Sequence, residues 1–475
     1  MNADARFAEA TSRSANPLQT DVPSVDATSK PTSSSRSQGS FRGSAATLTA
    51  IVTSDLSGVC RGRAVPSRRL PQALDTGVGW VPANLAITPF STLASPNPFG
   101  SHGDLRLIPD FDTYTELPDL SGNPSLAIML ADMKAPSGET WHCCPRDFLR
   151  RALDDLRTET GLTVKSTFEH EFVTLEESPR QHPFSLQAML AGEPLGSRLV
   201  DALSSAGLEP ETWLPEFGSH QWELTLQPAE ALVSADRAIL FRETVRHVAR
   251  QLGIPVSFSP VPAPSAATSG VHIHLSLWTV DGEPATFDAT RPGRLSATAG
   301  SFAAGILQHA RALLALTAPS PLSYRRLRPG NWSAGRAVLA DQDREALLRL
   351  PATVDRAGRN PASQLNLEYR AADATANPWI AMGALVRAGL EGLRNRLPMP
   401  PLAGATVNDQ PASLQPEDLP RSLHEALQEL EADETVTGWL PPDLLTTYLA
   451  VKREELQAVG HLDDEALCAV YADAY

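Results

Sequence analysis

The chain has 475 residues, a formal net charge of −15 and a hydrophobic share of 42%. That length allows two or three domains with a sizeable core, and the negative charge argues against nucleic acid or an anionic membrane as the main partner. Four scattered cysteines are too few for a disulfide framework, and neither a membrane-spanning apolar run nor a signal-peptide pattern is evident, so we expect a cytoplasmic protein.

The chain divides into a polar tail, a small strand-rich part and a larger mixed part. Residues 1–45 are rich in Ser, Thr, Ala, Pro and Asn, which predicts a disordered tail. Strand-like runs at 47–53, 105–108 and 126–130 predict a small N-terminal domain over 46–136. We expect a helix between Pro145 and Gly161, others at 228–252, 296–316 and 377–393, and a mostly helical stretch over 419–475. The order of elements predicts an α+β fold, with the large domain over 137–475.

The first segment with chemical character is 168–172 (FEHEF). On a strand, Glu169 and Glu171 share one face while Phe168, His170 and Phe172 share the other. Two carboxylates on one face of an apolar strand repel each other and raise their pKa values unless a cation lies between them. In isolation, such a pair more often marks a solvated strand face.

Two later segments repeat this pairing of polar residues. Residues 216–223 (EFGSHQWE) place Glu216 and Glu223 on either side of a glycine turn. Residues 271–276 (VHIHLS) place His272 and His274 on one strand face directly after Gly270, where a backbone can approach a ligand closely. A single histidine on a strand is more often a core residue than a ligand, but two beside a glycine favour a site.

Arginines gather further along the chain. They occur within 323–330 (SYRRLRPG), at Arg344 and Arg349, and at Arg370, which shares a strand face with Glu368. Guanidinium groups match the geometry of carboxylate and phosphate oxygens. The alternative interpretation is a surface salt-bridge network, which is common and has no catalytic meaning.

Together and in this order, the segments resemble the glutamine synthetase family along nearly the whole chain after the tail. The resemblance starts at 55–62 (DLSGVCRG) and 104–113 (DLRLIPDFDT) and continues through the acidic segments and 269–277 (SGVHIHLSL). It ends at 367–370 (LEYR), which leads to Asp373 and Asn377. The resemblance implies a small β-grasp N-terminal domain and a large catalytic domain of the glutamine synthetase/guanido kinase-like fold. It also implies a double-ring homo-oligomer with active sites between neighbouring subunits.

The resemblance further implies a role for each candidate residue. One divalent metal ion, near the acceptor substrate, would be bound by Glu171, Glu216 and Glu223. A second, bridging the ATP phosphates, would be bound by Glu169, His272 and Glu368, and such sets suit Mg²⁺ or Mn²⁺. The nucleotide would contact His274 and Ser276. The γ-phosphate and reaction centre would contact Arg344 and Arg349, and the glutamate substrate would contact Arg326 and Arg370.

The implied reaction has two steps. The γ-phosphoryl group of ATP moves to the substrate carboxylate and gives an acyl phosphate, and an amine then attacks the activated carbonyl while phosphate leaves. The amine must lose a proton first, which requires a carboxylate near its binding position. Asp55 matches the aspartate that does this in the family, where it serves the active site of a neighbouring subunit.

Three departures from the family pattern bear on the substrate. Typical members have a glutamate where this chain has Trp332, and Asn-Gly where it has Ala267 and Thr268. Both changes lie at the amine and glutamate end, and an aromatic surface in place of a charge that binds NH₄⁺ favours an organic amine. This resembles the γ-glutamylpolyamine and γ-glutamylanilide synthetase branches. The third departure, Asn366 in place of an arginine, weakens an expected phosphate contact.

The sequence therefore favours an ATP-dependent ligase that forms a γ-glutamyl amide from glutamate and an organic amine. A glutamine synthetase that uses ammonia is the first alternative. A non-catalytic structural member of the family is the second. Against the second stands the presence of the expected residue type at all six metal-binding positions, which a protein without catalysis has no physical reason to keep.

Overall fold

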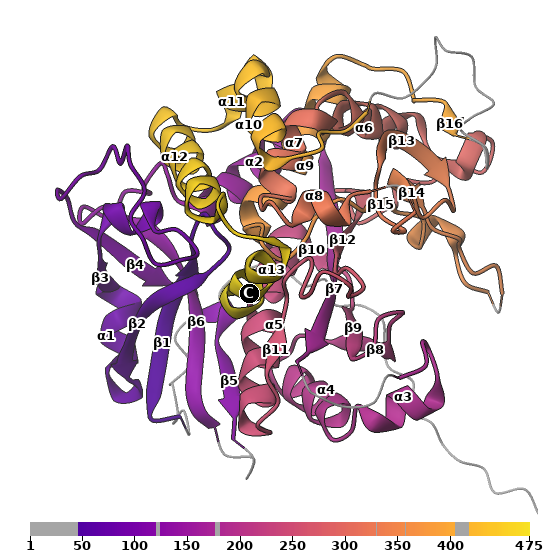
Figure 1. The fold of residues 1–475 in the computed structure, drawn as a ribbon. Helices are drawn as coiled ribbons and strands as arrows, with labels where there is room; N and C mark the ends of the chain where they lie inside the picture. The colour runs from indigo at the N-terminus through magenta and orange to yellow at the C-terminus, as the bar shows by residue number, and fades with distance from the viewer. Residues whose placement is uncertain (1–45, 120–123, 176–180, 329, 357, 404–417) are drawn as a thin grey trace, which may run out of the picture. The chain divides into compact units, whose positions relative to one another are not determined.

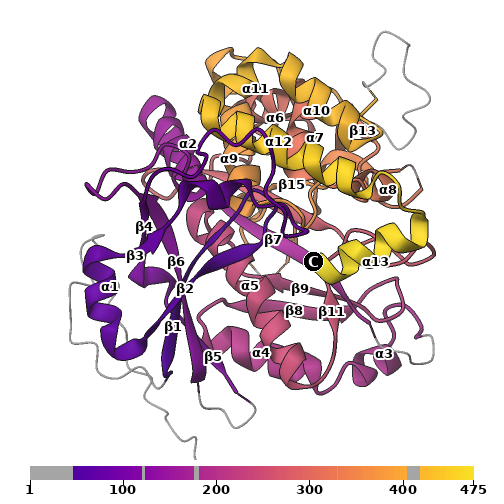
Figure 2. The same ribbon diagram turned by 60° about the vertical axis from the view of Figure 1, so that its left-hand side comes forward.

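The computed structural model describes residues 46–119, 124–175, 181–328, 330–356, 358–403 and 418–475. The predicted disordered tail, residues 1–45, lies outside this part of the chain. Residues 44–475 form one compact unit, which Figures 1 and 2 show from two directions. Two sheets organise this unit, one near its N-terminal end and one through its middle.

The first sheet has the strand order β2-β1-β6-β4-β3, and β5 pairs with β6. The β1–β2 hairpin is antiparallel, whereas β1 runs parallel to β6. The segments that the sequence predicted as strands are confirmed as β1, β4 and β6. The elements of this part are β1 (Leu48–Ser54), β2 (Cys60–Pro66), α1 (Leu70–Thr76), β3 (Val78–Trp80), β4 (Leu105–Pro109), β5 (Thr115–Pro118) and β6 (Pro124–Lys134).

The second sheet has the order β16-β13-β14-β15-β12-β7-β9-β8, and β10 and β11 also pair with β7. Its five middle strands, in the order β14-β15-β12-β7-β9, each run antiparallel to their neighbours. The strands are β7 (Leu162–Thr174), β8 (Pro210–Pro215), β9 (Gln221–Leu226), β10 (Ala229–Glu230), β11 (Val256–Ser257), β12 (Val271–Thr279), β13 (Arg336–Asp341), β14 (Ala346–Leu350), β15 (Leu367–Tyr369) and β16 (Leu402–Ala403).

Helices α2, α5 and α9 contact one another, and α2 and α5 also contact β7 of the second sheet. The expected helix after Pro145 is confirmed as α2, which ends at a left-handed Gly161. The helices are α2 (Pro145–Thr160), α3 (Leu186–Ala191), α4 (Leu195–Ser205), α5 (Ala231–Gln251), α6 (Ala297–Gln308), α7 (Ala310–Thr317), α8 (Ser323–Arg326), α9 (Pro378–Arg394), α10 (Leu423–Ala432), α11 (Glu434–Trp439), α12 (Pro442–Val459) and α13 (Asp464–Ala474).

Two helix predictions need correction. The single helix predicted over 296–316 is wrong, because His309 leaves helical geometry (φ −101°, ψ 11°) and separates α6 from α7. The Nδ1 atom of His309 lies 2.7 Å from a carboxylate oxygen of Asp433, a partner that the local sequence does not reveal. The helix predicted over 228–252 begins three residues later, because β10 first pairs with β7.

A buried arginine joins the first sheet to the helices. Arg146, at the start of α2, donates to Asp110 (2.7 Å) and Asp132 (3.1 Å) of the first sheet. It also donates twice to Asp236 of α5, at 2.9 and 2.7 Å. The boundary predicted near residue 136 lies just after β6 and stays a prediction. In the described part of the chain, no helix is long and apolar enough to cross a membrane.

Candidate active site

The second sheet brings the predicted acidic and histidine residues onto one face. Burial alternates along β7, so that Glu169 and Glu171 lie on its less buried side, as predicted. The register of the neighbouring strands extends this face on both sides. Its directly opposed pairs are Glu171 with Glu223 of β9, Glu169 with His272 of β12, and His274 with Glu368 of β15.

One half of this cluster holds its negative charge through histidine and arginine partners. Glu169 lies 2.8 Å from Nδ1 of His272 and 3.4 Å from Nε2 of His274. Burial opposes ionisation, but the hydrogen bond with His272 and the nearby His274 hold the pKa of Glu169 well below its usual range. Ligand atoms of Glu169, His272 and Glu368 all lie within 4.8 Å of one another. These three residues are therefore placed to share one metal ion.

The other half has an excess of negative charge. Burial and the charges of neighbouring glutamates raise the pKa of Glu223 to about 10, and its carboxyl group is hydrogen-bonded to that of Glu169. Burial raises the pKa of Glu171 to about 7, and burial also raises the pKa of Glu216. The carboxyl groups of Glu216 and Glu223 are hydrogen-bonded as well. The raised pKa values mark a concentration of negative charge, between whose carboxylates a cation would fit.

Carboxylate-rich sets of this kind suit hard divalent cations. Glu171, Glu216 and Glu223 would hold one such ion, because its charge would relieve their mutual repulsion. The assignment of the two sets to two separate ions remains a prediction.

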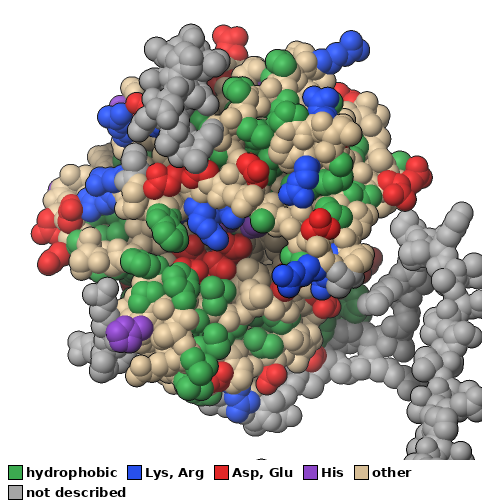
Figure 3. Space-filling model, turned by 90° about the vertical axis from the view of Figure 1, so that its right-hand side faces the viewer, with side chains coloured by type: hydrophobic (Ala, Val, Ile, Leu, Met, Phe, Trp, Pro, Cys, Tyr) green, Lys and Arg blue, Asp and Glu red, His purple; other side chains and the backbone are tan. Residues whose placement is uncertain are grey.

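Arginines border the cluster on the β14–β15 side. Arg349 of β14 donates to Glu368 at 2.6 Å, and Arg370 donates to the other oxygen of the same carboxylate. Arg370 also donates to the main-chain oxygens of Arg344 (2.8 Å) and Trp332 (3.0 Å). The Arg344 side chain is close enough to Glu216 to oppose the rise in its pKa. Arg349 and Arg370 therefore flank Glu368, and Figure 3 shows basic side chains next to acidic ones on one face of the molecule.

Arg326 reaches the site through a gap that only glycine provides. Its guanidinium donates to the main-chain oxygens of Arg370 (2.8 Å) and Ala371 (3.0 Å). A Cβ atom on Gly270 would lie 2.2 Å from Nη2 of Arg326. The glycine that the sequence marked as a close-approach position therefore admits this arginine. The charge of Arg326 opposes the rise in the pKa of Glu171.

A cavity of about 240 Å³ continues from Glu169 along β7 and β12. Its lining includes both predicted nucleotide residues, His274 and Ser276. It also includes residues that the sequence analysis did not assign to the site: Lys165, Trp278 and Gln364. The ammonium group of Lys165 lies 3.7 Å from the centre of the Trp278 ring. Lys165 lies four residues before Glu169 on the same strand face, so the alternation that identified Glu169 could have found it.

Another residue that sequence reasoning did not assign is Gln221. Its side-chain amide donates to Glu171 (3.0 Å) and to the main-chain oxygen of Thr268 (3.0 Å). Gly270 N–H donates to the same oxygen of Glu171 at 2.9 Å. Asn366, which was noted as a departure, lies 3.0 Å from Nδ1 of His274 and lines the nucleotide cavity. Gln221 thus orients one predicted metal ligand, and Asn366 orients a predicted nucleotide contact.

Asp55 lies in the turn between β1 and β2. One of its carboxylate oxygens accepts hydrogen bonds from the N–H groups of Ser57 and Val59, both at 2.9 Å. The other accepts from Nε of Arg61 at 2.5 Å. Burial raises the pKa of Asp55 although Arg61 opposes this. Every hydrogen bond recorded for this carboxylate is local, and its action on the site of a neighbouring subunit remains a prediction.

The fold and the site together define a carboxylate-rich centre, bordered by arginines, on the antiparallel strands of a mixed sheet. The model of the glutamine synthetase catalytic domain matches residues 142–466, and that of the glutamine synthetase N-terminal domain matches residues 36–141. The chain belongs to the glutamine synthetase family. Members of this family are ligases that use ATP and divalent metal ions, so the predicted enzyme class and α+β fold are confirmed.

Individual relatives agree on the family and differ in substrate. The chain is 32% identical over 447 residues to gamma-glutamylpolyamine synthetase GlnA3 of Streptomyces coelicolor, which covers 89% of this chain and 92% of the relative. It is 31% identical over 367 residues to glutamine synthetase of Methanocaldococcus jannaschii, covering 74% and 79%. A crystal structure described as a novel glutamine synthase homolog superposes with a TM-score of 0.84 at 42% identity, covering 92% of this chain and all of that one.

Proposed function

We propose that the protein joins the γ-carboxylate of glutamate to an organic amine, with ATP cleaved to ADP and phosphate. Glu171, Glu216 and Glu223 would hold one Mg²⁺ or Mn²⁺ ion, and Glu169, His272 and Glu368 would hold another. Arg344 and Arg349 would bind the γ-phosphoryl group while it passes to the carboxylate, and Arg326 and Arg370 would orient glutamate. The amine would then attack the acyl phosphate carbon, release phosphate and lose its proton with the help of Asp55.

The observation that carries the proposal is the position of Trp332. This tryptophan exposes 62% of its surface, and its backbone has a positive φ of 52°. Its main-chain oxygen is bound by Arg370, which in turn is bound to Glu368. An exposed ring on a backbone held this close to the site would offer a flat apolar surface to an acceptor, whereas a glutamate there would offer a charge to NH₄⁺. The relative named as a gamma-glutamylpolyamine synthetase supports an organic amine.

Phosphate release from ATP, Mg²⁺ and glutamate tests the proposal when ammonium is compared with putrescine, spermidine, ethanolamine, aniline and monoalkylamines. Turnover with an organic amine and little turnover with ammonium are expected. In the Trp332→Glu variant, the preference for the organic amine over ammonium should fall by on the order of tenfold. Trp332→Phe is the matched control, because it keeps an aromatic surface and should keep the preference. A wild-type enzyme that uses ammonium alone would refute the organic acceptor.

A glutamine synthetase that uses ammonia is the second candidate, and the relative from Methanocaldococcus jannaschii carries that name. Under this candidate, Trp332→Glu would leave the acceptor preference unchanged or improve turnover with ammonium. A non-catalytic role would give no metal-dependent ATP cleavage with any acceptor.

The proposed role of Asp55 requires the protein to form an oligomer. If Asp55 completes the site of a neighbouring subunit in a double ring, Asp55→Asn and Glu368→Gln subunits are each inactive alone but form some intact sites when mixed. Recovery of part of the wild-type activity on mixing is the expected result, and light scattering gives the number of subunits. Two inactive variants that stay inactive as mixed oligomers would place Asp55 at the site of its own subunit, and an active Asp55→Asn variant would place it outside the reaction.

A further inference from the structure

The turn that carries Asp55 is held from outside by side chains of distant elements. Its main-chain oxygens accept hydrogen bonds from three buried donors. Asn377 Nδ2 binds Ser54 O (3.1 Å) and Asp55 O (2.9 Å), Tyr475 OH binds Ser57 O (2.8 Å), and Arg242 Nη2 binds Gly58 O (3.2 Å). The N–H groups of the same turn bind the Asp55 carboxylate. A movement of the turn therefore moves the carboxylate with it.

Arg242 is unusual among these donors. It lies in the middle of α5 with only 2% of its surface exposed. Its Nη1 donates to Ala374 O at 2.6 Å, and its Nε atom has no hydrogen-bond partner. Both partners of its guanidinium are neutral carbonyl groups, and among the residues that the structure describes no carboxylate is hydrogen-bonded to it. A buried cation without a paired anion costs free energy, which an apolar residue at this position would avoid.

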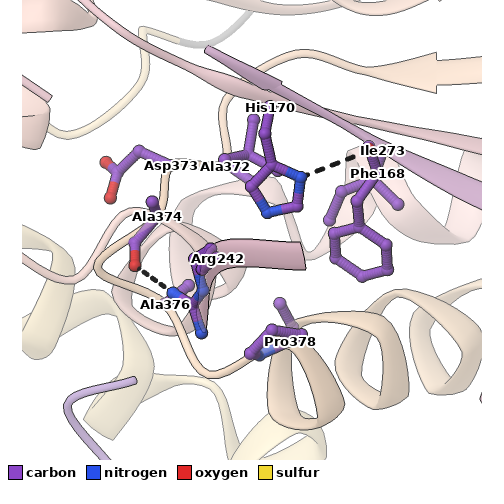
Figure 4. A pocket seen from close by; sticks show the side chains of 11 residues that line it. Phe168, His170, Arg242, Ile273, Ala372, Asp373, Ala374, Ala376 and Pro378 are labelled. Carbon is purple, nitrogen blue, oxygen red and sulfur yellow. Dashed lines mark hydrogen bonds between the residues drawn. The ribbon is translucent and has the colours of Figure 1, made fainter. Parts of the chain in front are cut away.

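Figure 4 shows Arg242 beside a small buried pocket on the side of β7 away from the glutamates, with its bond to Ala374 drawn as a dashed line. The pocket is lined by His170, Asp373 and Ala376 among others, and its volume of about 10 Å³ has room for roughly one water molecule. The guanidinium thus lies between the Asp55 turn and the loop after Arg370. Its two hydrogen bonds connect these two segments directly.

That loop is continuous with the substrate end of the site. Residues 371–377 follow β15 and Arg370, and Val271 N–H at the start of β12 donates to Ala372 O at 2.9 Å. Gly58 packs directly on the far end of the loop, where a Cβ atom would lie 2.9 Å from Ala376 O. The loop 371–377 therefore begins next to Arg370 and contacts the Asp55 turn at its far end.

We infer that Arg242 is a positioning residue for amine activation, which holds the Asp55 turn at a fixed place on the loop after Arg370. The inference rests on the proposed function, because it assigns Arg242 an effect on the step that uses Asp55. Arg242 touches neither substrate nor reacting atoms. It acts by fixing Gly58 and Ala374 relative to each other, and a guanidinium is suited to this because its forked donors reach two carbonyl groups at once.

The test compares Arg242→Gln with Arg237→Gln in the full-length protein. Arg237 is a matched control, since it lies on the same helix and also donates to two carbonyl oxygens, those of Gly207 and Gln227. In Arg242→Gln the KM for the amine should rise on the order of tenfold, while the KM for ATP stays within about twofold. Arg242→Lys should recover part of this loss. Arg237→Gln should leave both constants near the wild-type values.

Amide hydrogen exchange gives a readout that does not require turnover. Exchange in a peptide covering 54–60 should be on the order of tenfold faster in Arg242→Gln, with no such change in a peptide from α12. If Arg242→Gln does not fold, Arg242→Lys replaces it, because lysine keeps the positive charge and loses the forked donors that reach Gly58 O and Ala374 O together. The same local increase in exchange is then expected at 54–60.

The outcomes separate the inference from the proposed function. Unchanged exchange at 54–60 together with an unchanged amine KM in Arg242→Gln would overturn the inference. Equal losses in the KM values for ATP and amine would also overturn it, because they indicate a general structural defect. Wild-type protein that turns over no amine and no ammonium would refute the proposed function, and faster exchange confined to 54–60 would still support the role of Arg242 in holding the turn.

Discussion

Removal of one carboxylate from the cluster should stabilise the metal-free protein and abolish its stabilisation by metal. Glu223 lies between Glu169 and Glu216, and its carboxyl group is hydrogen-bonded to both. Its pKa of about 10 means that it keeps its proton at neutral pH when no cation is bound. The Glu223→Gln variant keeps the size of the side chain and removes the group that can ionise.

The magnitude follows from the pKa values. The unfolded chain releases this proton near the ordinary value of 4.5, while the folded protein binds it up to about pH 10. The free energy of unfolding of the metal-free protein therefore falls as pH rises through that window. Between the ordinary pKa and pH 7 lie roughly 2.5 units, which at about 1.36 kcal/mol per unit amount to about 3 kcal/mol. Glu223→Gln should avoid this loss.

Urea unfolding with EDTA at pH 5, 6 and 7 measures the effect, and a parallel series with Mg²⁺ measures stabilisation by the metal. From pH 5 to pH 7 in EDTA, wild-type protein should lose stability relative to Glu223→Gln, because the buried histidines His170 and His272, whose pKa values burial lowers to about 3 and about 4, contribute equally in both proteins. Mg²⁺ should restore the stability of the wild type, because binding displaces the proton, and should have little effect on Glu223→Gln. Glu283→Gln, at an exposed position, is the control. Equal pH dependence of wild type and Glu223→Gln in EDTA would refute the electrostatic reasoning.

Three further changes test other parts of the structure. Arg146→Met should lower the free energy of unfolding by about 3–5 kcal/mol in denaturant titrations, because Asp236 stays buried without its cation. Adding Asp236→Asn to this variant should recover part of the lost stability. Burial raises the pKa of the Cys144 thiol from 9.0 to about 11, so the free energy of unfolding should fall between pH 9 and pH 11. Unfolding measured across this pH range should show a fall that is smaller in Cys144→Ala, by up to about 3 kcal/mol. Gly270→Ala should reduce kcat/KM by about 10²-fold in the phosphate-release assay with a smaller change in melting temperature, because the new Cβ displaces Arg326.

The strand face that carries Glu169 and Glu171 could be predicted from the sequence because alternation is a local property. A strand places every second side chain on the same side, and burial along β7 follows that pattern. The opposition of Glu171 and Glu223 could not be read in this way, because strand register depends on how the whole sheet packs. Only the family resemblance brought these two residues together in advance.

The same contrast applies to residues that the sequence analysis missed. Arg242 lies in a helix with no motif around it, and its partners Gly58 and Ala374 are 184 and 132 residues away. The break at His309 likewise depends on Asp433, which is 124 residues away. Local propensity describes a helix through both positions, and tertiary contacts decide what each residue does there.

The substitutions that set this chain apart from the family pattern lie mostly in loops. Trp332 lies between α8 and β13, and Ala267 and Thr268 lie before β12, whereas the predicted metal ligands Glu169, Glu223 and Glu368 lie within strands. A loop side chain can change without altering strand register, so acceptor preference can drift while the charge arrangement stays fixed. The backbone of both loops is hydrogen-bonded to residues of the cluster: Arg370 donates to the main-chain oxygen of Trp332, and Gln221 donates to that of Thr268. New side chains at these positions therefore lie beside a cluster whose residues match the family pattern, which is the arrangement that the proposed change of amine acceptor requires.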